Sequence, residues 1–252
     1  MPVWIILVII VIALLAGAGV FVLERMVPAR RRETHNDVFG FVYAVVGVAY
    51  AVLLGLVVVG LWTTLDEAQA NTFTESDAVL AIAWYGHSLP QPEHGEILHL
   101  ATEYTDLVIN TEWPELAHQQ SSEQAWNVAD QLQHLVRDQQ PTAPAAVARY
   151  QEAIEAANQL DDARRERIEQ SSEGVPSLLW AALILGAIVT IGFAYFFGMK
   201  STIAHAVVMF SLTAIFACLL VVVFELNYPF AGIVKVEPDA FQLTAELIKQ
   251  IP

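Results

Sequence analysis

The chain has 252 residues, of which 56% are hydrophobic, and its formal net charge is −15. The hydrophobic share exceeds the value of about 45–50% that is typical of soluble domains, which indicates a membrane protein. A strongly acidic chain repels the phosphates that nucleic-acid-binding proteins neutralise with Lys and Arg, so nucleic acid is excluded as a partner.

Two apolar segments, residues 3–23 and 40–62, open the chain, and neither contains Asp, Glu, Lys or Arg. A helix needs about 20 apolar residues to cross the hydrocarbon core of a bilayer, so both are predicted to span it. Ala16-Gly17-Ala18 resembles a signal-peptide cleavage site, but the basic residues follow the first apolar segment instead of preceding it. Residues 1–62 are therefore expected to form a retained transmembrane hairpin.

The middle region, residues 63–175, is predicted to be an acidic helical domain outside the membrane. It contains 20 of the 27 acidic residues and only 5 of the 12 basic ones. Apolar residues recur at helical spacing in four segments, and prolines separate them. The expected helices are 63–86, which continues the second span, and 96–113, 122–137 and 145–170.

Two side-chain environments in this domain can be predicted from the same spacing. Trp113 is expected to lie in the core of the helical bundle. The charged run from Asp161 to Arg167 is expected to be mostly solvated, because charged residues usually remain at the surface.

A second transmembrane hairpin is predicted for residues 176–224, with spans at 178–198 and 203–224. Cys218 is the only cysteine, which excludes an intrachain disulfide and a metal site built on several cysteines. His205 opens the fourth span close to the membrane edge. An ionisable group inside a membrane segment is a candidate for gating, and a structural histidine is the alternative.

The charges of the short loops predict an orientation in the cell membrane. Four arginines, Arg25 and Arg30 to Arg32, lie between the first two spans, and Lys200 lies between the last two. Basic loops remain on the cytoplasmic side. The termini, the middle domain and the tail, residues 225–252, are therefore predicted to be extracytoplasmic.

The fold class predicted from these patterns is an all-α membrane protein. Four transmembrane helices form two hairpins, and an extracytoplasmic helical bundle lies between the second and third spans. The lipid bilayer is the first expected partner.

A set of residues in the tail, in two stretches of the middle domain and in the last two spans forms a recognisable combination. These residues are Leu226-Asn227-Tyr228-Pro229-Phe230-Ala231-Gly232, Val236-Glu237-Pro238-Asp239-Ala240-Phe241, Glu112-Trp113-Pro114, Asp162-Ala163-Arg164-Arg165-Glu166-Arg167, Trp180, Gly186, Tyr195, Phe197-Gly198 and His205. Together they resemble the bacterial bestrophin-like domain family, which consists of four-span membrane proteins.

The resemblance implies a remote relation to bestrophin anion channels, which are pentamers with four spans in each subunit. Bestrophins keep the region between spans two and three in the cytosol, whereas the loop charges place it outside here. In the tail we expect a structural motif in which proline and glycine set a defined turn after the fourth span. Its residues are Leu226, Pro229, Phe230, Gly232 and Pro238.

Gly47, Ala51 and Gly55 form a row of small residues in the second span, and Ala182 and Gly186 repeat the pattern in the third. Such rows allow helix backbones to approach closely. The row in the second span is interpreted as a pore lining or a contact between subunits of a homo-oligomer. Packing inside one subunit is the alternative.

No catalytic or metal site is predicted. Glu96, His99 and Glu103 share a helix face, but a second Glu-x-x-His pair, as in di-iron bundles, is absent from the sequence. The chain also has no phosphate-binding glycine loop and no nucleophile-elbow serine motif. We therefore expect neither a cofactor nor an enzymatic activity.

Two functions are compatible with these observations. The first is an oligomeric ion channel, which requires a pore-facing stripe on one span. The second is a non-conducting membrane scaffold or sensor whose outer helical bundle binds a protein partner.

Overall fold

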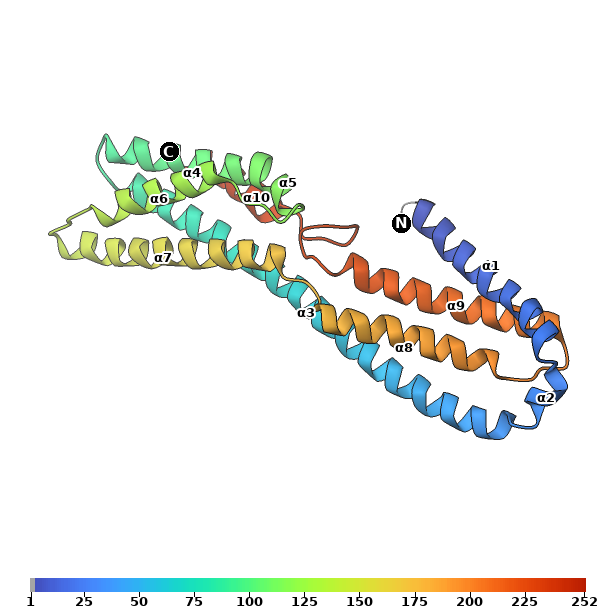
Figure 1. Cartoon of the computed structure of the whole chain (residues 1–252). Coiled ribbons are helices and arrows are strands. Elements are labelled where there is room, and N and C mark those ends of the chain that lie inside the picture. Colours follow the sequence, from blue (N-terminus) through green and yellow to red (C-terminus); the bar gives the residue numbers. More distant parts are fainter. Residues whose placement is uncertain (1–2) are drawn as a thin grey trace. The chain divides into compact units, whose positions relative to one another are not determined.

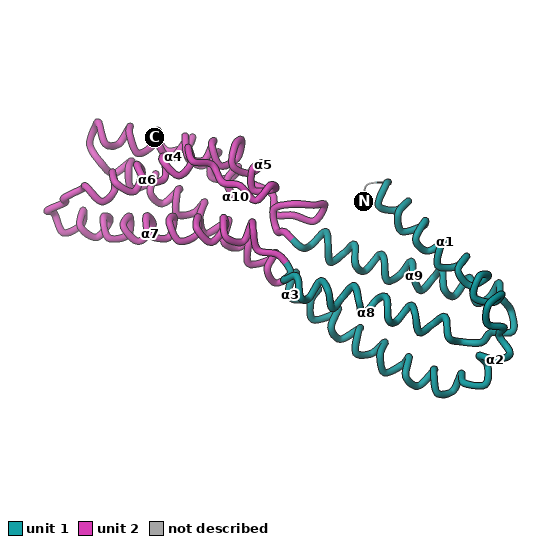
Figure 2. Tube along the Cα trace, in the orientation of Figure 1, with its two compact units in different colours: residues 1–62, 175–227 teal, residues 63–174, 228–252 magenta. Residues whose placement is uncertain are grey.

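The computed structural model describes residues 3–252, and all the regular elements in that range are helical. Four of its helices contain a stretch that is long and apolar enough to cross a membrane. The predicted all-α class with four apolar helices is therefore confirmed. The chain divides into two compact units, which are coloured separately in Figure 2: residues 1–62 with 175–227, and residues 63–174 with 228–252.

Unit 1 contains the apolar helices. They are α1 (Val3–Met26), the short α2 (Ala29–Glu33), the first half of α3 (Asn36–His87), α8 (Ser177–Tyr195) and α9 (Thr202–Glu225). Helix α1 runs beside α9 (Figure 1). A Cβ atom at Gly17 would lie only 3.1 Å from the carbonyl oxygen of Ala206, so this glycine allows the two backbones to pack closely.

Tyr50 joins three of the apolar helices. A Cβ atom at Gly186 of α8 would lie 2.5 Å from Cδ2 of the Tyr50 ring, so only glycine leaves room for the ring. On α9, Phe216 stacks against Tyr50 with ring centroids 5.0 Å apart. The small residue predicted for close packing in the third span is therefore used inside the subunit.

The loop between the first two spans closes the end of α8. Arg32 is buried, pairs with Glu24 and donates hydrogen bonds of 2.9 Å to the carbonyl oxygens of Tyr195 and Phe197. The Asn36 side chain donates to the carbonyl oxygen of Gly198 and accepts from its N–H, both at 2.9 Å. The last carbonyl groups of a helix have no partner within it, and a cation there is favourable, so this loop stabilises the α8–α9 turn.

Unit 2 is a helical bundle built around the second half of α3. It adds α4 (Glu93–Leu107), the π-helical turn η1 (Val108–Glu112), α5 (Trp113–Leu116), α6 (Glu123–Arg137), α7 (Pro144–Ser172) and α10 (Asp239–Ile248). Helix α6 contacts both α4 and α7, and α10 packs on α4. The helix expected at 96–113 is thus interrupted by a π-helical turn that the apolar spacing did not indicate.

Candidate functional site

Four charged side chains are completely buried in unit 2. Glu75 comes from α3, Glu112 from η1, and Arg164 and Arg167 from α7, and all four have 0% exposed side-chain area. The two arginines are three residues apart, so they project from the same side of α7. The cluster contains two positive and two negative charges and is formally neutral.

The arginines bind the two carboxylates through a shared network of hydrogen bonds. Arg164 meets Glu112 in a bidentate contact, with Nη1 to Oε1 at 2.9 Å and Nη2 to Oε2 at 2.6 Å. Nη2 of Arg167 donates to the same Oε1 at 2.6 Å, while its Nε donates to Oε2 of Glu75 at 2.5 Å. Bidentate charged contacts of this kind are strong and directional, so the network links α3, η1 and α7.

Aromatic side chains surround the two guanidinium groups. The Arg164 guanidinium lies 4.6 Å from the centre of the Trp126 ring, and that of Arg167 lies 5.4 Å from the centre of Trp113. The Tyr104 hydroxyl donates to Glu75 and accepts from Nη1 of Arg164 at 3.0 Å. Ring faces attract cations, so the aromatic shell replaces part of the solvation that the arginines lose.

The environment keeps Glu112 ionised and Tyr104 neutral. Burial alone would raise the pKa of Glu112, but Arg167 and Arg164 outweigh burial and hold this pKa below its usual value. Burial, reinforced by the negative charge of Glu75, raises the pKa of Tyr104 well above its ordinary value. Tyr104 is therefore a permanent hydrogen-bond donor to Glu75.

The C-terminal tail closes this core. Phe230 and Phe241 are buried and meet Trp113 edge to face, with centroid distances of 5.5 and 6.0 Å. The Trp113 indole N–H donates to the carbonyl oxygen of Val236 at 3.2 Å. The tail thus lies directly against the residue that covers Arg167.

The predicted tail motif forms a turn with one obligatory glycine. Gly232 has φ = 86°, a left-handed conformation that favours glycine. Beyond it, the N–H of Val236 donates to the carbonyl oxygen of Pro229 at 2.8 Å, and Pro238 immediately precedes α10. Leu226, the residue after α9, is buried. The structural role of the motif stays a prediction, but its residues occupy the positions that such a role requires.

The expectation that the charged run on α7 is mostly solvated was wrong for two arginines. Arg165 is solvated, with 67% of its side chain exposed, but Arg164 and Arg167 are fully buried. Trp113 does lie in the core, as predicted. The spacing of three between the buried arginines, and the Glu112-Trp113 pair elsewhere in the chain, were available signals. Only the fold brings them together.

Ala51 and Gly55 of the predicted row lie on the exposed side of α3, and Gly47 is half-buried. A Cβ atom at either glycine would meet nothing within 4 Å, and Ala51 is exposed. Tyr50, in contrast, points into the subunit. The role of this row as a pore lining or subunit contact stays a prediction.

Large apolar side chains accompany these small residues on the outward side of α3. Phe41, Val45, Val48, Val52 and Leu56 are all exposed within the single chain. An exposed apolar surface of this extent faces lipid, another protein chain or a hydrophobic pore. This face of α3 is the candidate functional surface in unit 1.

His205 is almost completely buried, and its Nε2 lies 3.2 Å from the carbonyl oxygen of Ala194. The contact joins the start of α9 to the end of α8. The gating role considered for His205 stays a prediction.

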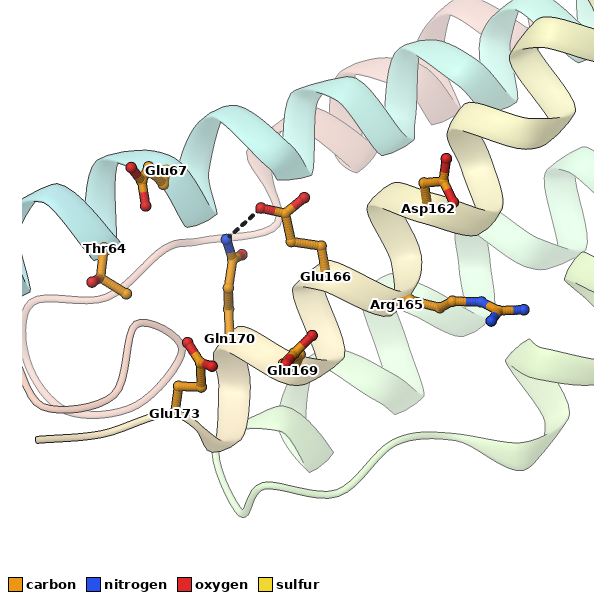
Figure 3. Close-up of a pocket in the computed structure, with 8 residues that line it drawn as sticks. All are labelled: Thr64, Glu67, Asp162, Arg165, Glu166, Glu169, Gln170 and Glu173. Carbon is orange, nitrogen blue, oxygen red and sulfur yellow. Dashed lines mark hydrogen bonds between the residues drawn. The ribbon is translucent and has the colours of Figure 1, made fainter. Parts of the chain in front are cut away.

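An acidic groove of about 500 Å³ lies between α3 and α7 in unit 2 (Figure 3). Gln170 extends into it and donates a hydrogen bond of 3.1 Å to Glu166. The other lining residues are Thr64, Glu67, Asp162, Arg165, Glu169 and Glu173. Within residues 3–252, no group of three or more His, Cys, Asp or Glu side chains has metal-binding geometry. On α4, His99 and Glu103 form only an exposed pair.

The fold defines the class of the protein: an integral membrane protein with four apolar helices and a helical bundle outside the apolar segments. The sequence model of the bestrophin-like domain matches residues 10–241. The chain therefore belongs to the bestrophin-like family. No curated protein sequence matches it.

Solved structures share the whole fold at low sequence identity. A bacterial bestrophin homologue from Klebsiella pneumoniae gives a TM-score of 0.71 at 11% identity, over 98% of each chain. A point variant of it gives 0.70 at 11% identity, again over 98% of each chain. A structure described as a membrane protein variant gives 0.69 at 12% identity, over 96% of this chain and 98% of that one.

The buried network generates a prediction for Glu112→Gln. Removing this charge leaves Arg164 and Arg167 with an excess of buried positive charge, and breaking a buried ion pair in this way costs about 3–5 kcal/mol. Thermal unfolding of the purified protein should show a large loss of stability. The control is Glu155→Gln, which removes an exposed charge from the same helix as the arginines and should have little effect.

The same variant has an expected pH dependence. Because the folded-state pKa of Glu112 is lowered, its ionised form adds stability above the unfolded pKa of about 4.3. That stability is lost as the pH falls through the folded pKa. Melting temperatures measured between pH 6 and pH 3 should therefore fall less steeply for Glu112→Gln than for the wild type. Equal slopes would contradict the assigned role of Glu112.

Proposed function

We propose that this protein is a homo-oligomeric ion channel in which the α3 helices of several subunits surround the pathway. The observation that carries the proposal is the outward face of α3, where a Cβ atom at Gly47 or Gly55 would meet nothing within 4 Å and Ala51 is exposed. No enzymatic step is part of the proposal.

Association of helices within lipid supports the oligomer. Lipid tails are as apolar as leucine, so membrane helices associate through close packing, which small residues permit. Inside the subunit, Gly17 and Gly186 already serve this purpose. The remaining row of small residues on α3 is available for a neighbouring copy.

The chemistry of the same face suggests how conduction is controlled. From Gly40 to Trp62, α3 has no charged residue. Its outward side chains are Phe, Val, Leu, Ala and Gly, so it offers no ion-coordinating ring. A constriction lined in this way gates by wetting and dewetting.

We further propose that both short loops face the cytoplasm and that unit 2 lies outside the cell. Arg25, Arg30 and Arg31 are exposed, which suits the positive-inside rule. Bestrophins have the opposite arrangement of the middle region, so orientation is a distinguishing property of this chain.

A membrane scaffold or sensor is the second candidate. It is favoured by Phe73 and Trp84, two large side chains that are exposed on α3 in unit 2. Trp84 lies beside a hollow of about 270 Å³ that Tyr85 and Arg149 also line. An exposed aromatic next to a hollow suits a protein partner.

The channel proposal predicts a current in planar bilayers containing the purified oligomer. The acidic surface concentrates cations near the mouth, and salt screens such fields over about 10 Å at 0.1 M. We expect weak selectivity that shifts with ionic strength. Assembled protein that carries no current across a range of voltage, pH and calcium would leave the scaffold as the better function.

Assembly is predicted to depend on Gly55. A leucine there separates neighbouring α3 helices, so Gly55→Leu should lower the mass of the complex in detergent. The melting temperature of the single subunit should stay the same. The comparison variant is Gly186→Leu, which collides with Tyr50 inside the subunit and should lower thermal stability. An unchanged mass for Gly55→Leu would place the subunit contact on another face.

Orientation is tested by labelling Ser121→Cys in a Cys218→Ala background. Ser121 is exposed in unit 2, so it should react in intact cells with a thiol reagent that does not cross membranes. Labelling that appears only after permeabilisation would reverse the proposed orientation.

A further inference from the structure

We propose that the acidic groove between α3 and α7 binds a linear organic polyamine, with the buried carbonyl of Gln170 as one of its acceptors. All the residues that line the groove belong to unit 2. The site therefore does not depend on whether the protein conducts ions or acts as a scaffold.

The observation that points to a ligand is an unpartnered oxygen atom in the groove. Of the lining residues, Gln170 alone is buried, with 6% of its surface exposed (Figure 3). Its Nε2 donates to Oε1 of Glu166 at 3.1 Å, but its own Oε1 is buried and accepts from no donor within residues 3–252. A buried carbonyl oxygen without a donor costs free energy, so this atom favours a ligand that donates to it.

The direction of this amide is fixed by its neighbour. A carboxylate accepts hydrogen bonds and donates none, so Glu166 must meet the NH2 end of Gln170. Turning the amide over would place two acceptor oxygens against each other. The unpartnered oxygen is therefore a property of the site, and its partner must be an N–H or O–H donor.

The groove also carries negative charge that its own chain does not compensate. Five carboxylates line it, one from α3 and four from α7: Glu67, Asp162, Glu166, Glu169 and Glu173. Apart from the contact between Glu166 and Gln170, none of these side chains takes part in an ion pair or hydrogen bond within residues 3–252. The basic lining residue, Arg165, pairs with Asp161 and extends away from Gln170 (Figure 3).

The carboxylates of α7 form a row that suits an elongated ligand. They are spaced by four, three and four residues, so one lies on each successive turn and the row advances about 16 Å at 1.5 Å per residue. In the described residues no three acidic groups have the geometry of a metal site. The groove measures about 500 Å³, far more than the roughly 30 Å³ of one water molecule. A compact metal ion therefore fits it poorly.

A linear polyamine meets each of these requirements. Its ammonium groups are positively charged and donate hydrogen bonds, and short methylene chains separate them, so they can follow a row of carboxylates from turn to turn. One ammonium N–H supplies the donor that Oε1 of Gln170 lacks. Others pair with Glu67 and Glu169, and hydrogen bonds between charged partners are the stronger ones.

The experiment titrates the purified full-length protein with spermidine in a calorimeter, at about 10 mM salt, where the Debye length is near 30 Å. Saturable binding at a single site in each subunit is expected. Gln170→Met keeps the length of the side chain but removes the acceptor, and should weaken binding about tenfold. Glu169→Gln changes an exposed side chain and should weaken it about threefold.

The matched control is Glu155→Gln, which removes the same charge from an exposed position of α7 outside the groove. It should bind spermidine as the wild type does. Thermal unfolding checks that each variant is folded. If Gln170→Met does not fold, Glu169→Gln and Glu67→Gln carry the test, because both residues are exposed.

Four results would overturn the proposal. The first is the absence of saturable binding, which leaves the groove as a solvated acidic surface. The second is equal displacement of spermidine by Mg²⁺ at the same concentration of charge, which marks a diffuse counter-ion. The third is unchanged affinity in folded Gln170→Met, since water then serves the carbonyl. The fourth is an equal loss in Glu155→Gln, which assigns binding to the overall acidity of unit 2.

Discussion

Unit 2 depends on the neutral cluster of two arginines and two glutamates at its centre. Arg164 and Arg167 belong to α7, Glu75 to α3 and Glu112 to η1. A buried ion retains its charge only when its partners compensate the lost solvation, so the elements that carry these residues must meet in one arrangement. The aromatic shell and the tail then pack against the same charges.

The apolar unit obeys a different constraint, because helices in lipid gain little from hiding apolar surface. The helices there associate through close packing, which glycine allows. Gly17 lets α9 pack closely against α1, and Gly186 leaves room for the ring of Tyr50. A Cβ atom at Gly47 or Gly55 of α3, in contrast, would meet no atom of its own chain within 4 Å. This difference separates the residues that build the subunit from those that are free to build an assembly.

Helix α3 connects the two kinds of chemistry in one continuous element of 52 residues. In unit 1 it presents small and aliphatic side chains outward, and in unit 2 it presents carboxylates and aromatics. The two parts of this one helix therefore belong to different chemical environments.

The sequence by itself determined the class of the fold, because the length and apolarity of a membrane span are local properties. Helical spacing also placed Trp113 in the core and located most of unit 2, although it missed the π-helical turn Val108–Glu112. The tail residues carried the family resemblance, which the match over residues 10–241 confirms.

Only the tertiary structure determined which charged residues and which glycines are buried against a partner. Arg164, Arg165 and Arg167 are equally polar in sequence, yet one is solvated and two are buried, because Glu75 and Glu112 approach α7 from distant parts of the chain. Gly55 and Gly186 are equally small, yet of the two only Gly186 packs against an aromatic ring, that of Tyr50. Burial and pairing depend on what lies opposite a residue, and the spacing of one segment holds no information about its partner.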